Sequence, residues 1–151
     1  MVDHKMTVMI SPLEVKGELD RYFPGAVLDI SGNALLVESE RLFTAADHLK
    51  NTPALAFDYL NYVTAVDYYD YFELVYRVTS LSHNHSLEFR VRCYNRTDPS
   101  VPSVTGVWRG ADFQEREIFD LFGIKFTGHP NLKHIVLWEG FQGYPLRKDY
   151  L

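Results

Sequence analysis

Residues 108–150 read WRGADFQEREIFDLFGIKFTGHPNLKHIVLWEGFQGYPLRKDY and carry the most informative pattern in the chain. Gly123 divides them into a charged, helix-like half and a longer arm rich in aromatic residues, glycine and proline. Glycine readily adopts the left-handed backbone that commonly ends a helix. We therefore predict a helix that ends at Gly123.

One face of this predicted helix is apolar except for a single carboxylate. Steps of three and four residues place on that face Trp108, Ala111, Glu115, Ile118 and Phe122. A buried carboxylate needs a hydrogen-bond donor, because burying it unpaired is costly. Glu115 is therefore expected to meet a donor in the fold or in a partner; the alternative is a solvated charge at the edge of the face.

Charged residues follow the other faces of the same helix. Arg116 lies one turn from both Asp112 and Asp120, which predicts a ladder of ion pairs centred on Arg116. Glu115 and Glu117 stand two positions apart and point to different faces, so they cannot flank one substrate bond as an acid/base pair.

The arm, residues 124–151, is apolar but has no sustained helical or strand period. A segment this apolar must be buried against its own domain or another protein. We expect it to reach outward, with Trp138, Phe141 and Tyr144 as apolar anchors and with Arg147 and Lys148 pairing with partner carboxylates. The alternative is that it folds back on its own sheet.

Several short motifs occur in a fixed order along this stretch. They are Glu115-Arg116-Glu117, Asp120-Leu121-Phe122-Gly123-Ile124, Gly128-His129-Pro130 and Gly143-Tyr144-Pro145-Leu146-Arg147-Lys148-Asp149. This order resembles the C-type subunit of NADH–quinone oxidoreductase, the "30 kDa" peripheral-arm subunit of respiratory complex I, which also has relatives in membrane-bound hydrogenase complexes. The match is densest over residues 103–150, and Phe113 stands where the family usually carries Trp.

The resemblance implies a set of structural or partner-binding residues rather than a catalytic set. They are Glu115, Arg116, Glu117, Asp120, Phe122, Gly123, His129, Pro130, Trp138, Pro145, Arg147, Lys148 and Asp149. It further implies a non-catalytic assembly subunit of a proton-translocating NADH:quinone oxidoreductase. Such a subunit braces the quinone-site subunit, which is related to the hydrogenase large subunit, and lies near the iron–sulfur subunits.

The resemblance also implies where the cofactors lie. NADH or another donor, FMN, iron–sulfur clusters and quinone would belong to other subunits, and this chain would bind none. It would lie on the cytoplasmic side of the cell membrane, held there through the complex. Alternatives are the same role in a ferredoxin-, coenzyme F420- or hydrogen-linked complex, or a general protein-interaction module.

The composition is ordinary for a globular domain. The chain has 151 residues, 46% hydrophobic and 23% charged, with a formal charge of −5 that argues against nucleic-acid binding. Its one cysteine, Cys93, excludes an internal disulfide and an iron–sulfur cluster ligated by this chain alone. No stretch resembles a signal peptide or a membrane span.

The remaining patterns predict a two-layer α+β domain over residues 1–123, followed by the arm over residues 124–151. Ser11, Pro12 and Glu14 form a helix start with a capping box. A hairpin follows over residues 27–37, a helix over residues 40–50, a strand over residues 57–66 and a hairpin over residues 72–93. The order is α-β-β-α-β-β-β, then the helix and the arm, with a largely antiparallel or mixed sheet.

Candidate catalytic or metal-binding residues are few. His83 and His85 provide two ligands on a turn, too few for a metal, and we interpret them as a solvated loop. His129 precedes Pro130 and resembles part of a turn, and neither it nor His134 has other ligands at metal-binding spacing. The glycines form no nucleotide-binding loop. Cys93 lies on the apolar side of a strand, where packing is the better interpretation.

Overall fold

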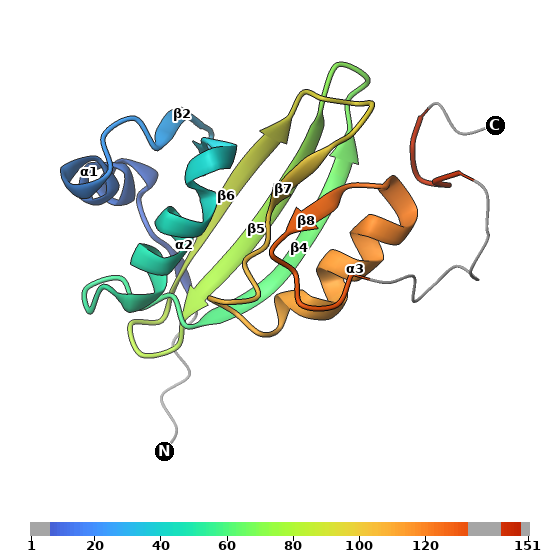
Figure 1. Cartoon of the computed structure of the whole chain (residues 1–151). Coiled ribbons are helices and arrows are strands. Elements are labelled where there is room, and N and C mark those ends of the chain that lie inside the picture. The colour runs from blue at the N-terminus through green and yellow to red at the C-terminus, as the bar shows by residue number, and fades with distance from the viewer. Residues whose placement is uncertain (1–6, 133–142, 149–151) are drawn as a thin grey trace.

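A computed structural model describes residues 7–132 and 143–148 (Figure 1). Its main sheet has six strands, five of them in the order β2-β3-β6-β5-β4, with β1 also paired to β6. The strands are β1 (Val8–Met9), β2 (Val27–Ser31), β3 (Ala34–Val37), β4 (Tyr59–Asp67), β5 (Phe72–Ser80) and β6 (His85–Cys93). β1 and β3 run parallel to β6, whereas the other pairs are antiparallel, so the sheet is mixed.

Alternation along β5 separates a buried face of the sheet from a polar one. Phe72, Leu74 and Tyr76 are fully buried, whereas the side chains between them belong to the opposite face. On that face Glu73 accepts hydrogen bonds from Arg90 at 3.1 Å and from Arg92 at 3.2 Å. This ion network satisfies the buried carboxylate of Glu73 in the middle of the sheet.

Three helices contribute to the same apolar core as the buried sheet face. They are α1 (Pro12–Tyr22), α2 (Leu42–Asn51), which follows the 3-10 turn η1 (Ser39–Arg41), and α3 (Ala111–Phe122). In Figure 1, α1 and α2 lie at the left of the view, where α1 contacts β2 and β3, and α3 lies at the right, where it contacts β4. The predicted two-layer α+β architecture is therefore confirmed.

A second, two-stranded sheet flanks α3. β7 (Ser100–Pro102) and β8 (Lys125–Thr127) pair in parallel, so that α3 is the crossover between them. These strands and β1 are additions to the predicted order. β8 lies just after the predicted domain boundary at residue 123; that boundary stays a prediction.

Two details of the predicted elements need correction. Ser11 does precede α1 with Pro12 at its first position, but the Ser11 side chain makes no capping hydrogen bond, so the predicted capping box is wrong. The turn histidines are not simply solvated: His83 Nε2 donates to the Pro53 carbonyl at 2.7 Å and His85 Nε2 to the Leu55 carbonyl at 2.9 Å. A carbonyl oxygen can only accept, so each Nε2 carries the proton.

Cys93 ends β6 in a buried position, 7% exposed, as its alternating pattern predicts. Its Sγ lies 3.8 Å from the carbonyl oxygens of both Asn95 and Ser100. The thiol therefore packs between the end of β6 and the start of β7. Among the described residues, no helix is long and apolar enough to span a bilayer.

Candidate functional site

The apolar face predicted for α3 lies in the core of the protein. Its members are Trp108, Ala111, Glu115, Ile118 and Phe122, and all are at most 8% exposed. Trp108 precedes the helix and is fixed by its indole Nε1, which donates to the Phe57 carbonyl at 2.8 Å. The spacing of three and four residues therefore identified the buried face correctly.

Glu115 is fully buried and finds its donors within the fold, as predicted. Ser103 Oγ donates to Oε1 at 2.6 Å, and the backbone N–H of Val104 donates to Oε2 at 2.9 Å. Burial raises the pKa of Glu115 to about 7; the two hydrogen bonds oppose that rise and the charge of Asp112 adds to it. The carboxylate thus ties the segment before α3 to the middle of the helix.

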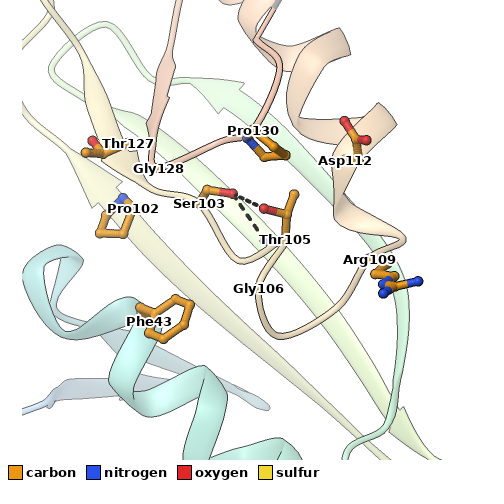
Figure 2. A pocket seen from close by; sticks show the side chains of 10 residues that line it. All are labelled: Phe43, Pro102, Ser103, Thr105, Gly106, Arg109, Asp112, Thr127, Gly128 and Pro130. Atoms are coloured by element: carbon orange, nitrogen blue, oxygen red, sulfur yellow. Dashed lines mark hydrogen bonds between the residues drawn. The ribbon is translucent and has the colours of Figure 1, made fainter.

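A hollow of about 820 Å³ opens beside this tether (Figure 2). Figure 2 shows Phe43 and Pro102 at one end of it and the charged Arg109 and Asp112 at the other. The other lining residues are Ser103, Thr105, Gly106, Thr127, Gly128 and Pro130. Ser103 and Thr105 hydroxyl oxygens lie 2.9 Å apart, so the hollow has a polar floor between an apolar and a charged end.

His129 fastens the turn after β8 to the first turn of α3. Its Nδ1 accepts the backbone N–H of Asn131 at 2.9 Å, so the proton of the neutral ring is on Nε2. Nε2 donates to the Asp112 carbonyl at 3.2 Å and lies 3.0 Å from the Asp112 carboxylate. The predicted structural role of the His129-Pro130 turn is therefore supported by its contacts.

The ion-pair ladder expected around Arg116 is not among the contacts of the described residues. The Asp112 carboxylate lies near His129 Nε2 instead, and Arg116 Nε is buried without a hydrogen-bond acceptor in the described part of the chain. Asp120 is fully buried, whereas Glu117 is exposed. Glu115 and Glu117 therefore do point to different sides of α3, as expected.

The C-terminal end of α3 is in close contact with residues 143–148. Gly123 has a φ of +76°, and a side chain there would place its first carbon 2.6 Å from the Tyr144 ring. Nearby, the backbone N–H of Leu146 donates to the Leu121 carbonyl at 3.0 Å, and Arg147 Nε donates to the Phe122 carbonyl at 2.5 Å. Residues 143–148 thus cap the carbonyls that α3 leaves open at its C-terminus.

Asp67, at the end of β4, holds the same C-terminal segment. It makes a two-pronged ion pair with Arg96, at 2.6 and 3.0 Å, and accepts the backbone N–H of Lys148 at 2.8 Å. The Arg96 hydrogen bonds hold the pKa of Asp67 well below its usual range, although burial opposes them. The Lys148 ammonium lies 5.0 Å from the ring centre of Tyr69.

These contacts place part of the arm on its own domain. Arg147 lies 5.2 Å from the Phe72 ring centre and 4.9 Å from that of Tyr144. Tyr144 likewise packs on Gly123. The pairing of Arg147 and Lys148 with partner carboxylates stays a prediction. Trp138, Phe141 and Asp149 lie outside the described residues.

Sequence reasoning missed three residues of this region: Ser103, Asp67 and Arg96. Ser103 lies between Pro102 and Val104, shortly before the helix, and nothing in that short sequence indicates a bond to Glu115. Asp67 and Arg96 are 29 positions apart, and no local pattern joins them. Within residues 7–132 and 143–148, three or more His, Cys, Asp or Glu side chains do not gather in a metal-binding arrangement.

Comparisons with known proteins agree on one family. The model of the family described as "Respiratory-chain NADH dehydrogenase, 30 Kd subunit" matches residues 35–151. A C-type subunit of NADH-quinone oxidoreductase from Rhizobium meliloti is 42% identical over 135 residues, which cover 85% of this chain and 73% of the relative. A second such subunit, from Rhizobium etli, is 44% identical over 76% of this chain and 62% of its own length.

Two further similarities extend the comparison. The C-type subunit from Moorella thermoacetica is 39% identical over 88% of this chain and 90% of its own length. A polypeptide in the structure of the membrane-bound sulfane sulfur reductase, described as an archaeal respiratory membrane complex, superposes with a TM-score of 0.73 over 91% of this chain and 84% of its own length. At 21% identity this last similarity establishes a shared fold.

Proposed function

Because the chain belongs to the family of the 30 kDa subunit of respiratory-chain NADH dehydrogenase, we propose that it is a non-catalytic subunit of a proton-translocating NADH:quinone oxidoreductase of the complex I type. In this role it braces the quinone-site subunit, the relative of the hydrogenase large subunit, within the peripheral arm. NADH, FMN, iron–sulfur clusters and quinone are then handled by other subunits. The chain is held on the cytoplasmic side of the membrane through the complex.

One observation carries the non-catalytic part of this proposal. The described motif residues that could do chemistry are used to hold the fold: Glu115 binds the segment before α3, His129 binds the first turn of α3, and Arg147 binds its last turn. They lie along α3 at separate points rather than converging on one hollow. Catalysis needs such convergence, because acid, base and substrate must lie within hydrogen-bonding reach.

A second candidate is the same bracing role in a related complex with another electron donor, such as ferredoxin, coenzyme F420 or hydrogen. The fold shared with a component of the sulfane sulfur reductase complex supports this alternative, because that assembly is described as a respiratory membrane complex. The two candidates differ in the partners and the electron donor, whereas the bracing role is common to both.

Affinity purification from gently solubilised membranes tests the proposal. A tagged chain should bring down a protein resembling the hydrogenase large subunit together with iron–sulfur proteins, and the preparation should oxidise NADH with a quinone. Activity with reduced ferredoxin or hydrogen instead would select the second candidate. Recovery of the tagged chain without any such companions would refute both.

The isolated chain provides an independent measurement. Purified alone, it should show no visible absorbance band and no stoichiometric iron, flavin or zinc, because the proposal assigns every cofactor to other subunits. A visible band or a tightly held metal at one per chain would contradict the non-catalytic assignment.

A further inference from the structure

A short loop separates two hollows on the surface of the protein. The first hollow, of about 820 Å³, is the one beside Ser103, and a second, of about 620 Å³, lies on the other side of residues 105–110. Thr105, Gly106 and Arg109 line both of them. Residues 105–110 therefore form a ridge, and an occupant that used both hollows would have to cross it.

The ridge is fixed at several points. Lys50 Nζ donates to the Val107 carbonyl at 2.7 Å, the Trp108 backbone N–H donates to the Val104 carbonyl at 2.8 Å, and Thr105 N–H donates to Ser103 Oγ at 3.1 Å. Trp108 itself is buried. A surface held in this way binds without a large ordering cost, which favours its use as a docking surface.

Among the residues that the structure describes, Arg109 is a charged residue of these hollows that has no acceptor. The charged residues that line them in the described part of the chain are Lys50, Asp58, Arg109 and Asp112. Lys50 donates to the Val107 carbonyl, Asp58 accepts from the Leu81 backbone N–H, and the Asp112 carboxylate lies 3.0 Å from His129 Nε2. Arg109 is exposed and, among the described residues, has no hydrogen bond or ion pair.

The other end of the first hollow is apolar and exposed. Phe43 on α2 is 45% exposed, and its ring would lie 3.1 Å from a first side-chain carbon at Gly106, so glycine lets the ring approach the ridge. Figure 2 shows Phe43 and Arg109 at opposite ends of this hollow, with Gly106 between them. Exposed aromatic and arginine side chains around one hollow are residue types that are enriched at the centres of protein interfaces.

We propose that the ridge, residues 105–110, is a docking site for an extended segment of a neighbouring subunit, which places an apolar side chain against Phe43 and a carboxylate on Arg109. The inference rests on the proposed function, because it takes the neighbour to be a subunit of the same complex. The occupant is a protein segment because it must cross the ridge between two hollows. It carries a carboxylate because Arg109, exposed on the ridge, has no acceptor within the described part of the chain, and a carboxylate is complementary to a guanidinium.

A zero-length cross-link tests the contact in the assembled complex. Arg109→Lys keeps the positive charge and supplies an amine, which a carbodiimide joins to a carboxylate only when the two are in direct contact. Arg21→Lys on α1 is the matched control, since Arg21 is exposed and lies 3.6 Å from Glu18 of its own helix. The control should give the internal link to Glu18 and so show that the reagent works.

For Arg109→Lys, mass spectrometry should find position 109 linked to an Asp or Glu of another subunit. In a second arm, Arg109→Glu and Phe43→Ala should each lower recovery of the complex by at least about tenfold. The controls Arg21→Glu and Leu13→Ala, which change exposed residues of α1, should stay within about twofold of wild type.

The outcomes separate this inference from the proposed function. If the complex co-purifies but position 109 stays unlinked, or links only to its own chain or to a second copy of it, the docking site is refuted and the bracing role stands. If the wild-type chain co-purifies with no subunits of such a complex, the proposed function falls and the inference falls with it. Circular dichroism of each variant confirms that lost recovery does not come from unfolding.

Discussion

At the scale of single residues, the carboxyl group of Glu115 has two usable states. As a carboxylate it accepts from Ser103 and from the Val104 backbone. When protonated it can donate to Ser103 Oγ, because that hydroxyl can turn its own proton toward Thr105, 2.9 Å away. With a pKa of about 7, Glu115 is divided between these states near neutral pH.

This division predicts a pH dependence of stability. The pKa of Glu115 is raised in the folded protein to about 7 from its ordinary 4.5, so the folded state holds the extra proton between these values. This proton on Glu115 stabilises the folded state, and its contribution to the free energy of unfolding is complete below about pH 4.5. The contribution, up to about 3 kcal/mol, is lost as the pH rises through 7. Urea unfolding of wild type and Glu115→Gln at pH 5 and pH 8 should show wild type losing stability relative to the variant. Parallel behaviour of the two proteins would refute this.

Removing the carboxyl group tests the tether itself. Glu115→Ala should cost about 1–3 kcal/mol of unfolding free energy, because Ser103 and the Val104 N–H lose a buried partner. Glu117→Ala is the matched control, an exposed glutamate of the same helix. Equal losses from the two substitutions, measured by thermal and denaturant unfolding, would mean that the tether contributes nothing specific.

At the scale of elements, α3 is held at both ends by chain segments that follow it. The turn around His129 contacts its first turn, and residues 143–148 cover its last. The predicted apolar face of α3 was correct because spacing along a helix is a local property. The ion-pair ladder is not found among the described contacts. Instead, the Asp112 carboxylate lies 3.0 Å from Nε2 of His129, 17 residues further along the chain, a contact that no local spacing indicates.

The end of α3 offers a comparison of two glycines with the same backbone. Gly123 and Gly128 both have positive φ, at +76° and +84°, but only Gly123 faces the Tyr144 ring. Both Gly→Ala substitutions should cost about 1–3 kcal/mol from the backbone alone. Gly123→Ala should cost more by unfolding free energy, since the ring must also move. Equal losses of unfolding free energy from the two substitutions would mean that moving the Tyr144 ring away from α3 costs no free energy.

Short strands are the elements that sequence did not reveal. β1, β7 and β8 have two or three residues each, too few for an alternating pattern to register. Their pairing depends on partners far along the chain, such as Val101 with Phe126. By contrast, β5 and β6 have nine residues each, and their alternation predicted both the hairpin and its buried face.

At the scale of the whole molecule, Asp67 joins three distant parts of the chain: the β4–β5 turn, Arg96 after β6, and Lys148 near the C-terminus. Figure 1 shows these segments at the same end of the sheet. No sequence pattern pointed to this junction, because it exists only once the hairpin and α3 have brought its members together. The fold class was predictable from local periodicity, whereas the contacts that hold the C-terminal segment were not.

Asp67→Asn should loosen that junction. Loss of the charge leaves Arg96 with weaker acceptors, at a cost of about 2 kcal/mol. Trypsin should then cut after Arg147 and Lys148 faster in the variant than in wild type, as followed by mass spectrometry. Because the pKa of Asp67 is depressed, its pairing is present above about pH 4 and fades only as the pH falls through the depressed value, so wild type should keep its protection at pH 5. Equal cutting rates would show that the C-terminal segment is held without Asp67.

The buried thiol of Cys93, between β6 and β7, can report when the junction of these two strands opens. A thiol-modifying dye cannot reach Cys93 while the end of β6 is packed against Ser100. The labelling rate should therefore equal the fraction of molecules in which that junction is open multiplied by the intrinsic labelling rate of the thiol. Since β7 leads directly to the ridge and to α3, binding of a neighbouring subunit there should lengthen the labelling time of a residue that the neighbour never touches. Incorporation into a complex could then be followed in time on the unmodified protein, without a tag.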